Sequence, residues 1–127
     1  MEYRYYEIPA GSPVLALLGD KWVQNYGREI DYLHFHKHLE VGFCYYGEGT
    51  VTFKEENLPF DGNMFTVVPK NFPHTTTSTG DSISYWEWLF IDADKFLREV
   101  YKDNPRMAQK VIDRVNKRAH FVSVQDK

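Results

Sequence analysis

The clearest alternation of apolar and polar positions runs from Tyr32 to Tyr46, where the chain predicts its longest extended segment. Odd positions in this segment are mostly apolar, whereas even positions carry three histidines, a glutamate and small residues. A period of two is typical of a strand whose two faces meet different surroundings. Histidine beside glycine and cysteine is unusual for a solvated face. We therefore interpret the even face as the lining of a cavity inside a barrel.

Short apolar runs bounded by glycine, proline and asparagine predict further strands. We expect these strands at residues 14–18, 21–26, 50–54, 64–68 and 82–91. Residues 55–61 are predicted to form a polar loop, and residues 75–81 are rich in Thr, Ser and Gly and are assigned no strand. A loop bracketed by prolines, residues 69–73, leads into His74. Many short strands with frequent turn residues indicate an all-β sandwich or barrel.

The hydrophobic period changes after residue 91 to the spacing of amphipathic helices. One helix is expected to begin after Asp92 or Asp94, either of which can cap it, and to run to about residue 102. Asn104-Pro105 separates it from a second helix at residues 106–119. We therefore divide the chain into an N-terminal arm at residues 1–12, a β-barrel at 13–91 and a helical segment at 92–127.

Composition narrows the class of protein. The chain has 127 residues, of which 17% are aromatic, and this suits one domain with a real core. A formal net charge of -3 argues against nucleic-acid binding by this chain alone. The longest apolar run is far too short to span a membrane, and the N-terminus lacks the form of a signal peptide. We expect a cytoplasmic protein that has no contact with a membrane.

Three histidines and a carboxylate are the candidate chemistry. His34, His36, Glu40 and His74 are ligand types that suit Zn, Fe, Mn or Ni. On a continuous strand, however, His36 and Glu40 would lie roughly 13 Å apart, at about 3.3 Å per residue. They can share one metal only if the chain bends near residues 37–39.

Two other interpretations stay open at this point. The same side chains can hydrogen-bond a small polar molecule without a metal, beside indole rings of Trp86 and Trp88 that stack on sugars or planar ligands. The histidines can also be ordinary hydrogen-bonded core residues, which is the usual state of a single buried histidine. Four ligand-type residues at this spacing make that last interpretation the less favoured one.

Two motifs resemble those of the cupin family. His34-x-His36-x-x-x-Glu40, followed by Gly47, resembles the first cupin motif. The stretch from Gly62 through Pro69-x-Asn71-x-x-His74 resembles the second, with Asn where many cupins have Gly and one extra residue before the proline. The resemblance implies a mainly β fold, a cupin (double-stranded β-helix or jelly-roll) barrel followed by C-terminal α-helices.

Longer stretches are similar to one branch of that family. HFHKHLEVGFCYYGEGTVTF, GNMFTVVPKNFPH and WEWLFIDADKFL resemble the N-terminal regulatory domain of AraC-type bacterial transcription regulators, over residues 13 to about 100. The resemblance implies a ligand-sensing domain, not an enzyme, that binds a small effector such as a sugar in the barrel. It also implies a homodimer, and DNA binding through a separate C-terminal helix-turn-helix domain that is not in this chain. The alternative is a stand-alone metal-dependent cupin enzyme, an isomerase or oxygenase.

The resemblance also assigns residues to the site. The predicted ligand-binding residues are His34, His36, Glu40, Tyr46, His74, Thr76, Trp86 and Trp88. A sensor of this type requires no cofactor, but the set of His34, His36, Glu40 and His74 keeps a divalent transition metal (Zn, Fe, Mn or Ni) open. The N-terminal arm around residues 5–9 is expected to fold over the mouth of the barrel as a ligand-gated lid.

Overall fold

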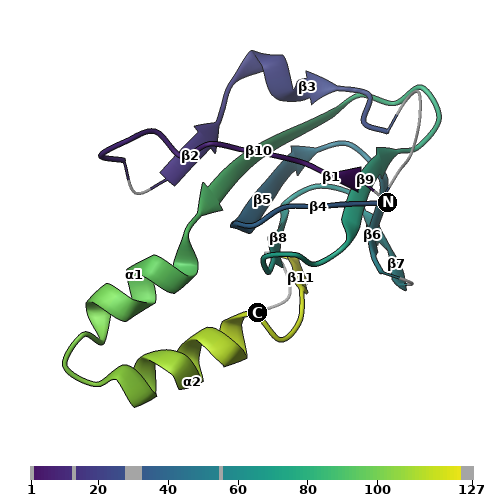
Figure 1. The fold of residues 1–127 in the computed structure, drawn as a ribbon. Coiled ribbons are helices and arrows are strands. Elements are labelled where there is room, and N and C mark those ends of the chain that lie inside the picture. Colours follow the sequence, from purple (N-terminus) through teal and green to yellow (C-terminus); the bar gives the residue numbers. More distant parts are fainter. Residues whose placement is uncertain (1, 13, 28–32, 55, 124–127) are drawn as a thin grey trace.

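Two β-sheets face each other in the computed structural model, which describes residues 2–12, 14–27, 33–54 and 56–123 (Figure 1). One sheet has the strand order β1 (Glu2–Tyr3), β4 (His34–Phe35), β9 (His74–Ser78), β6 (Gly49–Phe53) and β7 (Glu56–Phe60). The other has the order β11 (His120–Ser123), β8 (Met64–Val68), β5 (Leu39–Tyr46), β10 (Ser84–Ile91) and β2 (Val14–Leu17). A further short strand, β3 (Val23–Gln24), follows the 3-10 turn η1 (Asp20–Trp22) and pairs with β10. The predicted mainly β, two-sheet barrel followed by helices is confirmed.

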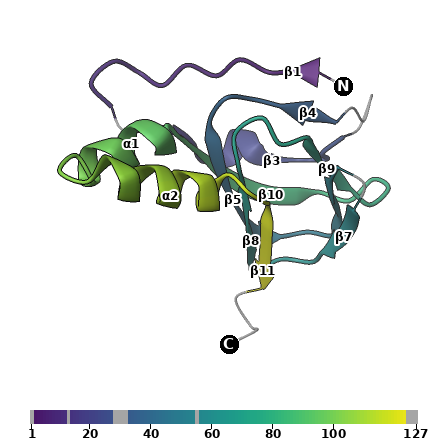
Figure 2. The ribbon, with the colours of Figure 1, turned by 60° about the horizontal axis from the view of Figure 1, so that its bottom comes forward.

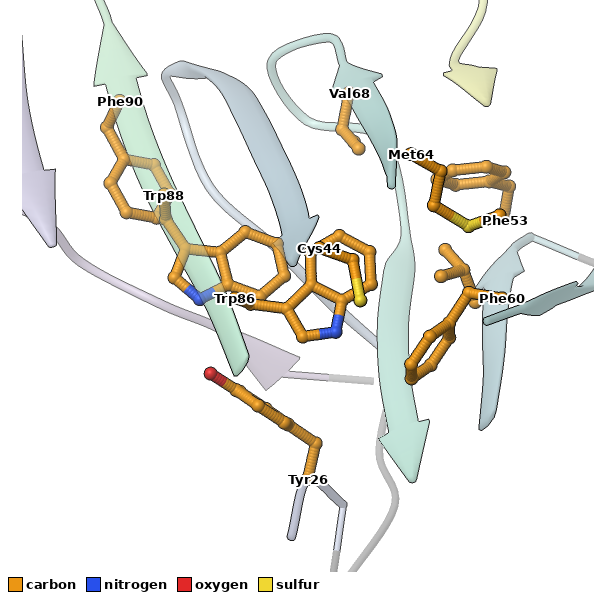
Figure 3. Packing of buried hydrophobic residues seen from close by; sticks show 10 residues of the cluster. Tyr26, Cys44, Phe53, Phe60, Met64, Val68, Trp86, Trp88 and Phe90 are labelled. Atoms are coloured by element: carbon orange, nitrogen blue, oxygen red, sulfur yellow. The ribbon is translucent and has the colours of Figure 1, made fainter. Parts of the chain in front are cut away.

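The core lies between the sheets and explains the alternation in β10. Trp86, Trp88 and Phe90 point inward, as their shared face predicts, and Trp86 meets Phe60 of the opposite sheet (Figure 3). Val51 belongs to the same buried cluster. The two indoles are stacked, with ring centroids 4.8 Å apart and an angle of 4° between the ring planes. This stacking holds the rings of β10 as one flat aromatic wall inside the barrel.

Glycine at position 42 is what lets that wall lie against β5. A Cβ atom at Gly42 would come within 2.5 Å of the Trp88 ring and 2.9 Å of Thr66 Oγ1. Real carbon atoms are not found so close, so any larger residue at this position displaces the indole. The sequence therefore pairs a large ring on β10 with the smallest residue on β5, directly opposite it in the antiparallel register.

The predicted single run from residue 32 to residue 46 is wrong, because the strand is interrupted. β4 ends at Phe35 and pairs with β9 in the first sheet, whereas β5 begins at Leu39 and pairs with β8 and β10 in the second. The chain crosses from one sheet to the other in between, where the His36 carbonyl accepts a hydrogen bond of 2.6 Å from Asn71 N–H. Residue 32 lies outside the described part of the chain.

Other boundaries differ from expectation because pairing partners decide them. The predicted loop at residues 55–61 contains the strand β7, whose Pro59 is tolerated because β7 is the edge of its sheet. β9 occupies the Thr-rich stretch that was assigned no strand, and β11 occupies part of the predicted tail. Only two residues of the expected strand at 21–26 are extended, and the arm contributes β1.

The helices are close to their predicted positions. α1 (Ala93–Val100) is capped by the Asp92 carboxylate, which accepts from Lys95 N–H, and α2 (Pro105–Val115) is capped in the same way by Asn104. They lie side by side at one end of the barrel (Figures 1 and 2). Within the described ranges, neither helix is long and apolar enough to cross a membrane. The division into arm, barrel and helical segment stays a prediction.

Candidate metal centre and ligand pocket

The four predicted metal ligands come together inside the barrel. His34 lies in β4, His36 in the crossing segment, Glu40 in β5 and His74 at the start of β9. One donor atom from each lies within 4.8 Å of the donors of the other three, and all four residues are buried. A shared metal requires a bend near residues 37–39, and the interruption between β4 and β5 supplies it. His36 and Glu40 therefore lie close together.

Backbone carbonyls orient two of the imidazoles. His36 Nδ1 lies 3.0 Å from the His38 carbonyl oxygen, and His74 Nδ1 lies 2.7 Å from that of Phe72. A carbonyl can only accept, so each Nδ1 carries the proton and donates it. Each Nε2 faces Glu40 Oε1 at 3.3 Å. A protonated ring donates a hydrogen bond to the carboxylate there, whereas a ring protonated only at Nδ1 leaves the Nε2 lone pair for a metal that would take the place of this proton. Hydrogen bonding of Nδ1 to a carbonyl is the outer-sphere arrangement that typically fixes histidine ligands around a metal.

Two of the donor separations match those around a divalent transition metal, and all four donors lie within 4.8 Å of one another. Bonds of about 2.0–2.1 Å place neighbouring donors of one ion roughly 3.0–3.4 Å apart, and the two 3.3 Å separations to Glu40 Oε1 fall in that interval. The buried Nδ1 of His34 has no hydrogen-bond partner among the described residues. Three imidazoles and a carboxylate, with two Nε2 atoms facing one carboxylate oxygen, form a donor set that suits Zn, Fe, Mn or Ni.

Electrostatics favour the metal-binding forms of Glu40 and His34, whereas they favour the protonated form of His74. Burial alone would raise the pKa of Glu40, but the charges and hydrogen bonds of His74 and His36 lower it well below its usual range. Burial would lower the pKa of His74, but the Glu40 carboxylate and the Phe72 carbonyl raise it. Burial, together with the charges of His74 and Arg4, lowers the pKa of His34 to about 3. Glu40 is therefore ionised and His34 neutral near pH 7, which are the forms that bind metal.

A cavity of about 660 Å³ adjoins the four-residue cluster, and its size is that of a small-molecule site. His34 and Glu40 form part of its wall, so a metal held by the cluster would face the cavity. The remaining lining residues are Glu2, Arg4, Tyr6, Leu17, Trp22, Gln24, Asn25, Tyr26, Gly27, Thr75, Thr76, Trp88 and Phe90. One wall is aromatic, and the others carry polar and charged groups.

The N-terminal arm packs against the cluster and forms one wall of this cavity. Tyr6 stacks on Phe90 with ring centroids 4.3 Å apart, and its ring also contacts that of His36. The Tyr6 carbonyl accepts a hydrogen bond of 2.8 Å from His38 Nε2, so His38 holds the arm and is not part of the cluster. Of residues 5–9, for which a lid is predicted, only Tyr6 lines this cavity, and the other arm residues in its wall are Glu2 and Arg4. A ligand-gated lid stays a prediction.

The other predicted ligand-binding residues are placed unequally. Thr76 and Trp88 line the cavity. Trp86 is fully buried behind Trp88, and its Nε1 has no hydrogen-bond partner within the described part of the chain. Tyr46 is 48% exposed at the end of β5, where its ring contacts Tyr85, and it does not line the cavity.

Several lining residues were missed by the sequence analysis, chiefly those of the arm and of the segment from Trp22 to Tyr26. The signal for the arm was present: Glu2, Arg4 and Tyr6 alternate with Tyr3 and Tyr5. Alternation over so few residues next to Pro and Gly suggested an irregular arm, and nothing local indicates which sheet edge it joins.

Comparisons with known proteins find similarity among solved structures. No protein-family model matches the chain, and a search of the curated proteins finds no match either. Among solved structures, a cupin protein from Bacteroides fragilis shares 15% identity and a TM-score of 0.49, over 63% of each chain. Oxalate decarboxylase of Bacillus subtilis, a protein with Mn(II) centres, shares 23% identity and a TM-score of 0.42, over 48% of this chain and 17% of that one. A Neisseria meningitidis protein shares 18% identity and a TM-score of 0.43, over 61% and 69%.

The fold and the site together define a class of domain. Two facing sheets enclose a pocket, and the residues of the two sequence motifs meet on the inner strands beside it. This is a cupin-type β-barrel followed by two helices, with a candidate divalent metal centre of three histidines and one glutamate.

Proposed function

We propose that this chain is a ligand-sensing domain of the AraC type, with a divalent metal in the wall of its effector pocket. The observation that supports this is the composition of the pocket. The same cavity is lined by two members of the cluster, His34 and Glu40, and by the arm residues Arg4 and Tyr6. A small polar molecule in the cavity touches both, so its binding can change the position or order of the arm.

Each group of residues has a role in this proposal. His34, His36, Glu40 and His74 hold the ion, which supplies a Lewis acid that attracts an oxygen of the effector. Thr76 offers a hydroxyl, and Trp88 offers a flat apolar wall that excludes water. The arm changes its position or order when the effector occupies the pocket. Promoter binding by a separate C-terminal domain, a homodimeric state and a cytoplasmic location belong to the same proposal.

The first test is the metal content of the purified protein by elemental analysis, followed by a thermal-shift screen of sugars and small acids. We expect near-stoichiometric metal, lost in His36→Ala, and a ligand-dependent rise in melting temperature that is lost in Trp88→Ala. The regulator part is tested on the gene. If the intact reading frame encodes no helix-turn-helix segment, the AraC assignment fails while the metal-binding pocket stands.

A metal-dependent enzyme, an isomerase or oxygenase, is the second candidate. The specific observation in its favour is that the complete donor set of the cluster converges beside an open cavity. Metal-loaded protein that turns over a diol, a sugar or an organic acid, with loss of turnover in Glu40→Gln, would support it. Effector binding with no product over long incubation would favour the sensor.

A further inference from the structure

The arm adds charged side chains to the pocket in a regular order. β1 pairs in parallel with β4, with Glu2 opposite His34, and Arg4 N–H continues the pairing by donating to the Phe35 carbonyl at 2.8 Å. Strand alternation then places Glu2, Arg4 and Tyr6 along the cavity wall. Tyr3 and Tyr5, the residues between them, are 48% and 65% exposed. The arm is therefore part of the pocket wall and is paired there with β4.

Arg4 is the cation among the described residues that line this pocket, and it interacts with Glu2 and with the Tyr6 side chain. Its Nε donates to Glu2 Oε1 at 2.9 Å, and the two side chains keep 41% and 48% of their surface exposed. A guanidinium has five N–H donors in one plane and matches a carboxylate through two parallel hydrogen bonds. An exposed pair of this kind is weak and exchanges readily. The pairing with Glu2 therefore shows that Arg4 binds a carboxylate in this position. A ligand carboxylate can displace that of Glu2.

The charge balance of the pocket favours an anion. A bound divalent ion would add two positive charges to the single negative charge of Glu40, and Arg4 and Glu2 cancel each other. In the metal-loaded protein the sum is therefore one positive charge, obtained as +2 - 1 + 1 - 1, for the charged groups of the pocket wall. In a partly dehydrated site this charge attracts a ligand carboxylate more strongly than it would in water.

The opposite wall selects flat molecules. Trp88 lies on the cavity wall with 8% of its surface exposed, and the parallel ring of Trp86 packs behind it (Figure 3). Gly42 packs against the same ring and leaves no room there for a Cβ atom. Tyr26 meets the Trp88 ring at 70°, with its hydroxyl tied to the Trp22 carbonyl at 2.6 Å. Rings held this firmly offer a planar stacking surface and adapt poorly to a bulky saturated ligand.

We propose that the pocket binds a small planar carboxylic acid, with Arg4 of the arm receiving the carboxylate and Trp88 stacking on the flat part. This inference rests on the proposed function and narrows its effector class from polar molecules in general to conjugated or aromatic acids. Arg4 thereby becomes the residue through which ligand and arm are coupled.

The test uses the whole chain with a purification tag at the C-terminus, loaded with Zn²⁺, at fixed ionic strength. Benzoate, benzamide and cyclohexanecarboxylate are titrated in turn by calorimetry. Benzamide keeps the ring but not the charge, and cyclohexanecarboxylate keeps the charge but not the flat ring. We expect benzoate to bind roughly tenfold or more tightly than either, because each lacks one of the two interactions. Equal binding of all three, or binding of sugars alone, would overturn the inference.

Variants on the arm make the assignment specific. Arg4→Gln is expected to weaken benzoate binding roughly tenfold or more, since a charge-assisted fork is lost. Glu2→Gln is expected to tighten it, because the internal competitor for Arg4 is removed. Opposite effects from two neighbouring residues are not what a general loss of arm structure produces. Arg106→Gln, on the exposed start of α2, is the matched control and should leave binding unchanged.

Zinc binding separates failure of this inference from failure of the proposed function. If the protein binds Zn²⁺ but benzoate binding is absent or unaffected in Arg4→Gln, the acid-binding role is refuted and the metal centre stands. If Zn²⁺ does not bind, the metal centre fails, and benzoate is titrated against metal-free protein. Binding that still depends on Arg4 would then support the inference, and no binding would refute it.

Discussion

Replacement of Gly42 by alanine tests how tightly the aromatic wall of the pocket is held. The added Cβ would lie 2.5 and 2.7 Å from two carbons of the Trp88 ring and 2.9 Å from Thr66 Oγ1. Ordinary carbon contacts begin at about 3.5 Å, so the indole must move by roughly 1 Å. Its stacking on Trp86 opposes that movement. Overpacking of this kind costs about 1–3 kcal/mol.

The assay is urea unfolding followed by tryptophan fluorescence, with thermal melting alongside. A loss of about 1–3 kcal/mol corresponds to a melting temperature lower by roughly 3–10 °C for a domain of this size. A double-mutant cycle isolates the clash. In a Trp88→Leu background the ring is absent, so Gly42→Ala should cost clearly less, and the coupling free energy should be about 1 kcal/mol or more.

Two results would refute the reasoning about Gly42. One is a Gly42→Ala variant that melts within about 1 °C of the wild type, far less than the overpacking estimate. The other is a cycle with no coupling to Trp88, which would place the cost of the substitution elsewhere. If the reasoning holds, the displaced indole should also weaken binding of benzoate. Zinc content should stay unchanged because the added Cβ meets Trp88 and Thr66 and none of the four donor residues, although Glu40 lies on the same strand.

Three further predictions concern the metal, the pH dependence and a helix cap. Saturation with Zn²⁺ at a hundredfold excess over its Kd should stabilise the protein by about 2.7 kcal/mol, and neither EDTA-treated protein nor His36→Ala should show this gain in a thermal melt. In metal-free protein, His34 stays neutral down to about pH 3 while the unfolded chain takes up a proton near pH 6.5, so stability should fall as pH drops through this window. His34→Gln should reduce the loss of unfolding free energy between pH 6.5 and 4.5 by roughly 2–3 kcal/mol in urea titrations. An unchanged dependence of this free energy on pH would contradict the role of His34. Asp92→Ala removes the acceptor of Lys95 N–H at the start of α1 and should cost about 1 kcal/mol, measured by the same titrations, with Asp113→Ala on the exposed face of α2 as control.

The local features of this protein were predictable because local chemistry decides them. Alternation identified the inward face of β10, and the caps Asp92 and Asn104 marked the helix starts. The strand β7 was missed because Pro59 and polar neighbours give it no strand signal of its own. Pairing with β6 supplies the backbone hydrogen bonds that make it a strand.

The lining of the pocket could likewise be predicted only in part from local sequence. Trp86 and Trp88 share a face of one strand and could not be told apart by sequence, yet one is fully buried and the other lines the cavity. Depth inside a barrel depends on how far the opposite sheet extends over each residue. Arg4 was overlooked because its place in the wall follows from parallel pairing with a strand about thirty residues away.

The sequence alone determined which donor atoms are present: three imidazoles and a carboxylate, at a spacing that allows a metal site only if the chain bends. The tertiary structure decided that they meet. The chain leaves one sheet after Phe35 and enters the other at Leu39, and β9, the neighbour of β4 in the first sheet, places His74 directly opposite His34. Such convergence depends on pairing between distant strands, whose hydrogen bonds and buried surface exist only in the folded barrel.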